Sequence, residues 1–464
     1  MIRLGDVLMK VVKFGGSSLA TGKQLEKVFN IVTSDPSRRI IVVSAPGKRN
    51  AEDEKVTDLL IASGLHAMNG ESPQPFIDQV IGRYRDIAED LALPPTIIET
   101  IKDDLLSRVN GSQSDPEQYI DTLKASGEDN HAKLVACYFQ MKGVHAKYMN
   151  PGDAGLIVTN EHGNAQVLPS AYNKLVELRD CEEIIIFPGF FGYSEEGDIF
   201  TFSRSGSDVT GSILAHAVKA ELYENYTDVD AVFSVNPTFV EHPKEIKELT
   251  YREMRELSYA GFTVLHDEAL IPAIQAGIPV QIKNTNNPAA KGTKIVNSRD
   301  NTNGPVVGIA SGGGFCSIYV SKYLLNREIG FGRRLYSILE QYGISYEHTP
   351  SGIDDVTVII RENQLDAEEE NHIIEQIVSE LQADEVNIQH SLALIMVVGE
   401  GMRHNIGTMA RAANALAQAE VNIEMINQGS SEVSMMFAVK EVDEKRAVQA
   451  LYNEFFQPAS VLTV

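Results

Sequence analysis

Lys13-Phe14-Gly15-Gly16-Ser17-Ser18 is the stretch whose residue types point most directly to chemistry. It closes a short apolar run, and a segment with helical spacing follows it. A strand, a glycine turn and a helix start together direct backbone N–H groups at an anion. A lysine beside such a turn suits a phosphoryl group whose charge is neutralised during transfer. Because glycines at such turns often serve only packing, other motifs must decide between the two interpretations.

Four further stretches place glycines, hydroxyls and charges where strands should end or helices begin. They are Ser44 to Lys48 with Thr57, Ser126 to Glu128, Arg204 to Asp208, and Thr227 with Asp228. Hydroxyl and acidic residues in front of a helix are usually caps, which is the simpler interpretation of each stretch alone. Arg204 favours an anion site, because a cation before a helix N-terminus is otherwise unfavourable.

Glu128 stands alone among small residues, which suits an acceptor for the ammonium group of a ligand. From the sequence alone, a solvated loop acid is an equally good interpretation. A lysine at a phosphate turn, an arginine at a second anion site and a free carboxylate would together hold a nucleoside triphosphate and a zwitterionic acid.

Strand-like apolar runs alternate with helical patterns from residue 11 to about residue 295, which predicts an α/β fold. The expected strands are Val11–Phe14, Ile40–Ser44, Gly155–Thr159, Glu183–Phe187, Glu221–Thr227 and Pro279–Ile282. Nearly continuous β-branched runs predict parallel strands covered on both faces, and such a sheet gathers ligand groups at its carboxyl edge. Residues 58–150 are largely helical in period, so we interpret them as an excursion from the sheet.

Polar and turn residues from Asn284 to Pro305 form the clearest boundary in the chain. Beyond it the sequence repeats: Ile329-Gly330 corresponds to Ile406-Gly407, 77 residues later. Each copy has the pattern strand, helix, strand, turn, strand, helix, which predicts two α+β modules. We therefore expect a catalytic domain at 9–295, a linker at 296–305, and modules at 306–390 and 391–464.

The composition excludes several classes of protein. A net charge of −24 argues against nucleic acid or an anionic membrane as a partner. Three widely separated cysteines fit a reducing compartment, and no histidine or cysteine spacing predicts a metal site. The first residues are too short and acidic for a secretion signal, so we expect a cytoplasmic protein.

Taken in order, these motifs closely resemble the aspartokinases of the amino acid kinase family over nearly the whole chain. The KFGG start, SGE, the R-x-G-S-D segment and TDV follow the family's order, and the terminal modules resemble a pair of ACT domains. Neither GxxxxGK[ST] nor a dinucleotide GxGxxG motif is present. The resemblance implies a three-layer fold with a mostly parallel sheet. It also implies phosphorylation of the L-aspartate β-carboxylate by ATP, the first step towards lysine, threonine and methionine.

The resemblance also implies roles for individual residues. Lys13 would contact the transferring phosphoryl group, and Asp208 is the second catalytic candidate. Glu128 would bind the substrate ammonium and Arg204 its α-carboxylate, through a bidentate pair. The attacking carboxylate needs no general base, and magnesium would arrive with ATP. The remaining substrate positions are Ser44, Thr57 and Ser207, and the ATP positions are Lys13, Gly15, Gly16, Ser17, Thr227, Asp228, Phe233 and Lys283.

Several positions depart from the commoner pattern of the family. Arg204 is flanked by Ser203 and Ser205, where many relatives have glycines. Near the expected nucleotide site, Phe233 replaces a frequent tyrosine and Asn236-Pro237-Thr238 replaces Asp-Pro-Arg. Asn286 stands where a lysine can occur, and Lys283 is its expected substitute. These departures concern the ATP contacts and leave the amino-acid site intact.

The ACT-like modules imply feedback inhibition by an end-product amino acid, with lysine as the first candidate and threonine as the second. The expected effector positions are Phe331, Gly332, Tyr346, Glu347 and Ser351. Pairing of exposed sheet edges between chains predicts a homodimer or a larger assembly.

Two alternatives stay open at this stage. One is another amino acid kinase, acting on glutamate or N-acetylglutamate; the latter offers no ammonium for Glu128. The other is a non-catalytic amino-acid sensor, against which the joint presence of Lys13, Glu128, Arg204 and Asp208 argues.

Overall fold

The computed structural model describes residues 8–203, 205–262, 267–300, 304–429 and 433–457. These residues form two compact units. The first holds the described residues of Met1–Val232, Glu245–Tyr251 and Thr263–Arg299, and the second those of Phe233–Lys244, Arg252–Phe262 and Asp300–Val464. No helix in the described ranges is both long enough and apolar enough to cross a membrane.

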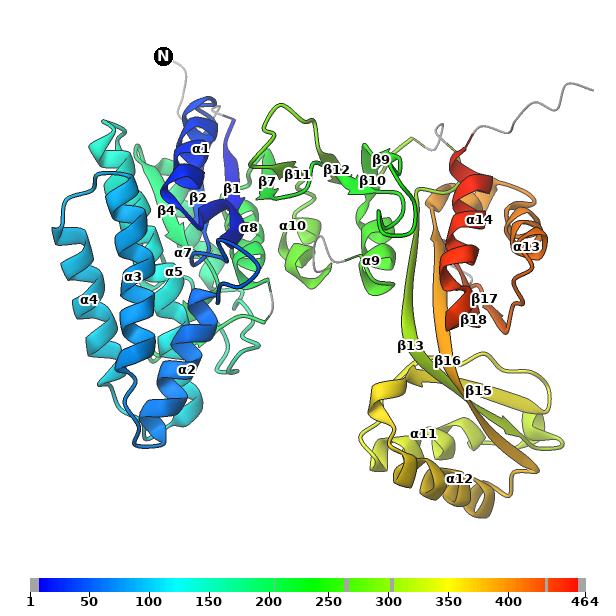
Figure 1. Cartoon of the computed structure of the whole chain (residues 1–464). Helices are drawn as coiled ribbons and strands as arrows, with labels where there is room; N and C mark the ends of the chain where they lie inside the picture. Colours follow the sequence, from blue (N-terminus) through cyan, green and yellow to red (C-terminus); the bar gives the residue numbers. More distant parts are fainter. Residues whose placement is uncertain (1–7, 204, 263–266, 301–303, 430–432, 458–464) are drawn as a thin grey trace, which may run out of the picture. The chain divides into compact units, whose positions relative to one another are not determined.

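An eight-stranded sheet forms the centre of the first unit (Figure 1). Every neighbouring pair is parallel except β11 with β12. Since β1 lies between β2 and β7, the strand order reverses at β1, the place where open α/β sheets bind ligands. The strand order is β10 (Glu248–Thr250), β12 (Thr293–Val296), β11 (Val280–Asn284), β7 (Leu222–Thr227), β1 (Lys10–Phe14), β2 (Arg38–Val43), β4 (Ile184–Pro188) and β3 (Ala146–Tyr148).

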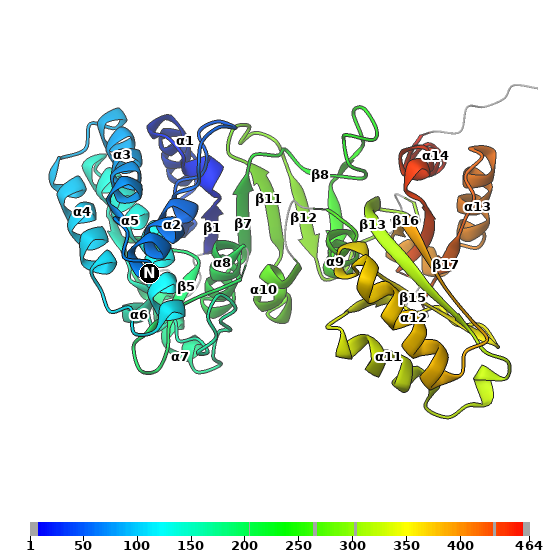
Figure 2. The same cartoon turned by 60° about the horizontal axis from the view of Figure 1, so that its bottom comes forward.

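Helices cover both faces of this sheet, as the continuous apolar runs predict (Figure 2). One core joins Val12, Phe14 and Val43 to the buried faces of α1 and the helical excursion. The other face is covered by a layer that includes α8. The first layer consists of α1 (Gly22–Thr33), α2 (Val56–Met68), α3 (Gln74–Asp90), α4 (Thr96–Val109) and α5 (Pro116–Met141); the second includes α7 (Ala171–Leu175), α8 (Gly206–Ala217) and α10 (Ile271–Gln275).

Two local predictions were wrong. Ser126 to Glu128, expected ahead of a helix, lies in the middle of α5. Gly127 lets this helix approach the end of β2, because a Cβ there would lie 3.0 Å from the Ala45 Cβ. The expected strand at Gly155–Thr159 forms only isolated bridges, between Ile157 and Tyr193 and between Val158 and Val167. The short helix α6 (Pro151–Ala154) precedes this segment, whose bridges reach β5 (Phe191–Tyr193), the partner of β6 (Ile199–Thr201).

The second unit contains a six-stranded antiparallel sheet. Two separate cores, one for each half of the sheet, pack against two pairs of helices. The expected module boundary between residues 390 and 391 falls inside β16, which both halves share. The strand order is β14 (Tyr346–His348), β15 (Asp355–Arg361), β13 (Gly308–Ser321), β16 (Glu385–Val398), β18 (Ser434–Lys440) and β17 (Met425–Asn427), with α11 (Phe331–Gln341), α12 (Ala367–Leu381), α13 (Thr408–Gln418) and α14 (Glu444–Phe456).

The sequence repeat is visible in the helices of the second unit. Helices α11 and α13 begin and end 77 residues apart, at Phe331–Gln341 and Thr408–Gln418. Gly330 and Gly407 precede them with φ of 80° and 89°, a conformation that glycine adopts at little cost. The repeat predicted from the sequence is therefore confirmed.

Candidate active site

Lys13 lies at the carboxyl end of β1 and is 8% exposed. Its Nζ lies 2.5 Å from the Asp208 Oδ1 and 3.5 Å from the Asn225 Oδ1. The Asn225 Nδ2 in turn donates to the same Asp208 oxygen over 2.8 Å. The buried ammonium is therefore neutralised and held in one position, as a buried cation requires.

The N-terminus of α8 brings Ser207 and Asp208 to the edge of the sheet. Asp208 lies in the first turn, where the helix dipole favours a carboxylate. Gly189, directly after β4, lets Ser207 approach, because a Cβ there would lie 2.6 Å from the Ser207 Oγ. Ser205 enters the helix with φ of 62°, a left-handed conformation that is unfavourable for a serine.

The glycine turn after β1 is held by backbone contacts on two sides. Gly15 donates its N–H to the Tyr226 carbonyl over 3.1 Å, and Gly47 donates to the Gly16 carbonyl over 2.9 Å. A Cβ on Gly47 would lie 2.5 Å from the Gly16 carbonyl carbon. Ser17 is exposed at this turn, whereas Ser18 is buried and hydrogen-bonds Thr285 over 2.7 Å. Gly47 therefore serves close packing, which leaves the exposed part of the turn free to meet a ligand.

Two side chains of α5, three residues apart, hold the peptide group between Ser44 and Ala45. His131 Nδ1 lies 2.7 Å from the Ser44 carbonyl oxygen. The Ala45 backbone N–H donates to the Glu128 carboxylate. Residues three apart share one face of a helix, so both groups lie over the end of β2. This peptide continues the strand that neighbours Lys13 in the sheet.

Glu128 is the unpaired acid of the site. Its side chain is 5% exposed, and among the described residues its Oε2 has no hydrogen-bond partner. Burial raises the pKa of this carboxyl from 4.5 to about 8, against a smaller lowering by the Ala45 N–H. The solvated-loop interpretation of Glu128 was wrong, because this carboxyl is buried in the middle of α5.

His131 is fully buried and stays neutral. Burial lowers its pKa from 6.5 to about 4. Because a carbonyl oxygen only accepts, Nδ1 carries the proton and Nε2 is an acceptor. In the described part of the chain, Nε2 has no hydrogen-bond partner.

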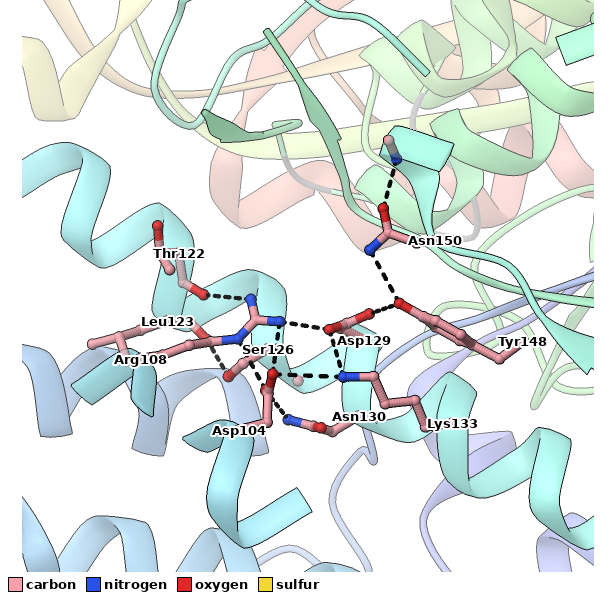
Figure 3. A network of polar contacts seen from close by, with 12 residues as sticks. Asp104, Arg108, Thr122, Leu123, Ser126, Asp129, Asn130, Lys133, Tyr148 and Asn150 are labelled. Carbon is pink, nitrogen blue, oxygen red and sulfur yellow. Dashed lines mark hydrogen bonds and ion pairs between the residues drawn. The ribbon is translucent and has the colours of Figure 1, made fainter. Parts of the chain in front are cut away.

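A polar network around Asp129, the residue after Glu128, fixes the rotation of α5 about its axis (Figure 3). Asp129, 2% exposed, lies 2.5 Å from Arg108 Nη2 and 3.0 Å from Lys133 Nζ. Tyr148 donates its hydroxyl to the second Asp129 oxygen, and Asp104 pairs with Arg108 over 2.9 Å. Because the network joins α4, α5 and β3 next to Glu128, it holds that carboxylate against Ala45.

The expected ATP residues occupy several places at the sheet edge. Thr227 ends β7 and donates to the Asp228 carboxylate over 3.1 Å, and Asp228 is exposed. Lys283 pairs in register with Tyr226, and its Nζ lies 5.9 Å from the centre of that ring. Since side chains alternate along a strand, Tyr226 and Lys283 lie on the face opposite to Asn225.

Two other expected residues, Thr57 and Phe233, form no hydrogen bond or ion pair with Lys13 or Glu128 in the described part of the chain. Thr57 is half-buried in the first turn of α2. Phe233 ends β8 (Val232–Phe233) and belongs to the second unit. Arg204 lies outside the described residues.

Sequence reasoning missed four residues of this region. Asn225 could have been found as a polar side chain inside a buried strand, and Gly189 as the end of the IIIFPG run. His131 and Arg83 carried no signal, because both lie in helices whose long-range partners the sequence does not reveal.

The expected effector residues lie in the first half of the second unit. Phe331 is buried at the start of α11 and Gly332 is half-buried beside it. Tyr346 is exposed and stacks on Tyr336. Glu347 pairs with Arg361 over 3.1 Å, while Ser351 lines a separate cavity of about 420 Å³ over the sheet.

No group of three or more histidine, cysteine, aspartate or glutamate side chains in the described ranges is arranged to hold a metal ion. The three cysteines are unpaired thiols, of which Cys316 is buried and the other two are half-buried.

Comparisons with known proteins agree over nearly the whole chain. The model of the Amino acid kinase family matches residues 9–284, and an ACT domain model matches residues 395–455. Aspartokinase 3 of Bacillus subtilis (strain 168) is 68% identical over 448 residues, covering 97% of this chain and 99% of that protein. The crystal structure of Clostridium acetobutylicum aspartate kinase is 38% identical, with a TM-score of 0.86, covering 96% of this chain and 100% of that one.

The fold is also that of E. coli aspartokinase III. Its structure in complex with aspartate and ADP is 24% identical, with a TM-score of 0.76, covering 97% of this chain and 100% of that one. The structure of the same protein in complex with lysine and aspartate has a TM-score of 0.75.

Proposed function

This chain belongs to the aspartokinases of the amino acid kinase family, and we propose that Lys13 and Glu128 serve its two substrates separately. The enzyme transfers the γ-phosphoryl group of ATP to the β-carboxylate of L-aspartate, which gives 4-phospho-L-aspartate. This reaction is the first step towards lysine, threonine and methionine.

Lys13 serves the phosphoryl transfer. Its ammonium is held by Asp208 and Asn225 at the strand end, beside the glycine turn. It neutralises the charge that the transferring group shares with the attacking β-carboxylate, while the Gly15 to Ser17 turn receives the phosphates. Thr227, Asp228 and Lys283 are the proposed nucleotide residues of the first unit. Magnesium arrives with ATP and is held by its phosphates and waters.

Glu128 receives the α-ammonium of aspartate. The single observation that supports this role is its buried Oε2, which has no partner in the described residues. A cationic ligand pairs with this acceptor and stabilises its ionised form, which burial otherwise disfavours. An N-acetylated substrate carries no ammonium, so it offers the carboxyl no cationic partner. Arg204 takes the α-carboxylate, and Ser44, Thr57 and Ser207 line the same side.

The transfer needs no general base, because the β-carboxylate is already ionised at neutral pH. Positioning and charge neutralisation therefore carry the rate enhancement. His131 remains neutral and bonded to the backbone, which fits a supporting rather than a proton-transferring group.

A coupled assay of ADP release across aspartate, glutamate, N-acetylglutamate and homoserine tests this assignment. We expect turnover with aspartate alone, lowered by about 10³-fold in Lys13→Ala. Turnover with N-acetylglutamate and none with aspartate would contradict it, and no turnover with any of the four would favour a sensor.

The second unit regulates the enzyme by binding an end-product amino acid. We place lysine first and threonine second, at Phe331, Gly332, Tyr346, Glu347 and Ser351. Glu347 exchanges Arg361 for the ligand ammonium in this proposal. A thermal-shift panel with lysine, threonine and methionine, singly and paired, tests it. The lysine shift should vanish in Glu347→Gln, and a shift equal to that of the unsubstituted enzyme would contradict the placement.

The proposed assembly is a homodimer or larger, formed through the second unit. Ile329 and Ile406, at the same position of the two repeats, are 97% and 102% exposed. These exposed apolar residues precede α11 and α13, and β14 and β17 are the edge strands of the sheet, so both features suit a second copy of the chain. Sedimentation of Ile329→Glu with Ile406→Glu should show a smaller species than the unsubstituted enzyme. The proposed compartment is the cytoplasm.

A further inference from the structure

Arg83 of α3 reaches the segment that supports the glycine turn. Its side chain is 4% exposed, and its Nη2 donates to the Gly47 carbonyl. Its Nη1 donates to the Glu54 carbonyl over 2.9 Å and lies 2.8 Å from the Asp53 Oδ2. One guanidinium therefore joins three points of the loop between β2 and α2 to the helical excursion.

Gly47 transmits this contact directly to the phosphate turn. Its N–H bonds the Gly16 carbonyl over 2.9 Å, and there is no room for a Cβ between the two backbones. The Ser17 backbone nitrogen lies only 2.7 Å from where that Cβ would be. Any movement of Gly47 must therefore move the Gly16–Ser17 peptide.

The neighbouring residue of α3 makes the corresponding contact with the aspartate side. Tyr84 is fully buried, and its hydroxyl donates to the Gly127 carbonyl over 2.6 Å. Gly127 directly precedes Glu128 in α5. Consecutive residues of α3 thus support both proposed substrate sites. Arg83 supports the glycine turn through Gly47, and Tyr84 supports Glu128, the proposed ammonium acceptor, through Gly127.

We infer that Arg83 is a positioning residue for the nucleotide phosphates, acting through Gly47 on the Gly15 to Ser17 turn. This inference rests on the proposed function, because it takes that turn as the phosphate site. The bonds to Gly47 and Glu54 use backbone carbonyls, so a planar fork with several donors is needed. A lysine keeps the charge but cannot span these acceptors.

Arg49 provides a matched control within the same loop. It binds Asp53 through Nε over 2.9 Å and also pairs with Asp86, so it shares the carboxylate partner of Arg83. The structure gives Arg49 no hydrogen bond to Gly47. Arg49→Gln therefore tests loss of the Asp53 pair without loss of the support for the glycine turn.

The experiment compares steady-state kinetics of Arg83→Lys, Arg83→Gln, Tyr84→Phe and Arg49→Gln in the full chain, with folding checked by circular dichroism. We expect both Arg83 variants to raise the KM for ATP and lower kcat, by about 10-fold each, because an error of about 1 Å in positioning is costly. The KM for aspartate should stay within twofold. Tyr84→Phe should raise the KM for aspartate and leave the KM for ATP within twofold. Arg49→Gln should have the same kcat and KM values as the unsubstituted enzyme.

An unchanged KM for ATP in folded Arg83→Lys would overturn the inference, as would equal changes in both KM values. If Arg83→Gln does not fold, Arg83→Lys decides. The unsubstituted enzyme is measured in the same assay: lack of aspartate turnover there would count against the proposed function, whereas normal turnover with unaffected Arg83 variants would count against this inference alone.

Discussion

Two buried ionisable groups of the first unit, Lys13 and Glu128, have opposite surroundings. At the end of β1, Lys13 is paired with Asp208 over 2.5 Å and Asn225 completes the cluster. On α5, Glu128 is buried with an unpaired oxygen and a pKa raised to about 8. In the proposed site, the first group has its partners before substrate binds. The second has an oxygen without a partner in the described residues, and the substrate ammonium would supply one.

This difference shows which interactions should affect rate and which should affect binding. A preformed, neutralised lysine changes little on binding and acts when charge develops in transfer. In the proposed site, the Glu128 carboxylate would gain its partner when aspartate binds, so its contribution should appear in affinity. The following predictions test this division, from the largest expected effect to the smallest.

Replacing Lys13 should have the largest effect. Lys13→Ala removes the charge that stabilises the transferring phosphoryl group, so we expect kcat to fall by about 10³-fold. Aspartate affinity, measured by calorimetry, should change by less than about threefold, because Glu128 is untouched. A loss of aspartate affinity as large as the loss of kcat would contradict the separate roles of Lys13 in transfer and Glu128 in binding.

Glu128→Gln should lower the affinity for aspartate more than it lowers kcat. Loss of a charge-assisted bond of about 1.5–3 kcal/mol raises the Kd for aspartate by about 10- to 100-fold. The KM for ATP should be unaffected. Calorimetry measures the Kd for aspartate and steady-state kinetics the KM for ATP, and a rise confined to the KM for ATP would contradict the assignment.

The same variant should be more stable than the unsubstituted enzyme at high pH. The Glu128 pKa lies above its ordinary value, so the folded state binds an extra proton between pH 4.5 and 8. Stability of the unsubstituted enzyme therefore falls as pH rises through this window. Glu128→Gln avoids that loss, so its Tm without aspartate should exceed that of the unsubstituted enzyme at pH 8 and lose the advantage below pH 4.5.

His131 should produce a smaller effect with the opposite pH dependence. Its pKa is lowered from 6.5 to about 4, so the unfolded chain takes up a proton that the folded chain does not. Stability is lost as pH falls through this window, and His131→Gln should flatten that slope in urea titrations. A slope unchanged by the substitution would mean that this histidine is not buried in its neutral form.

Ser205→Gly should have the smallest effect and a stabilising one. A serine at φ of 62° is strained by about 1–2 kcal/mol, part of which glycine returns as greater freedom in the unfolded chain. We expect a net gain of up to about 1 kcal/mol in urea unfolding. A destabilised variant would show that the Ser205 side chain stabilises the folded state by more than its backbone strain costs.

Much of the fold was predictable because it depends on local patterns. Continuous β-branched runs identified β2 and β4, and the spacing of Gly330 and Gly407 identified the repeat. The prediction failed where the pattern was ambiguous. Gly155–Thr159 is rich in β-branched residues, but it forms only isolated β-bridges.

The site was predictable where a motif marks it and not where long-range packing makes it. Lys13 and Asp208 were expected and do meet, from elements almost 200 residues apart. The burial of Glu128 and the bond from His131 to Ser44 depend on how α5 packs on β2, which no local pattern reveals. Arg83 was missed for the same reason.

The most direct test is the proton balance of aspartate binding at pH 7. Calorimetric titrations of the unsubstituted enzyme in phosphate and Tris buffers give the number of protons released. With a pKa of about 8, Glu128 is mostly protonated in the free enzyme and must ionise to pair with the ammonium. We expect release of about one proton by the unsubstituted enzyme and none by Glu128→Gln. Binding of aspartate to the unsubstituted enzyme without proton release would contradict it.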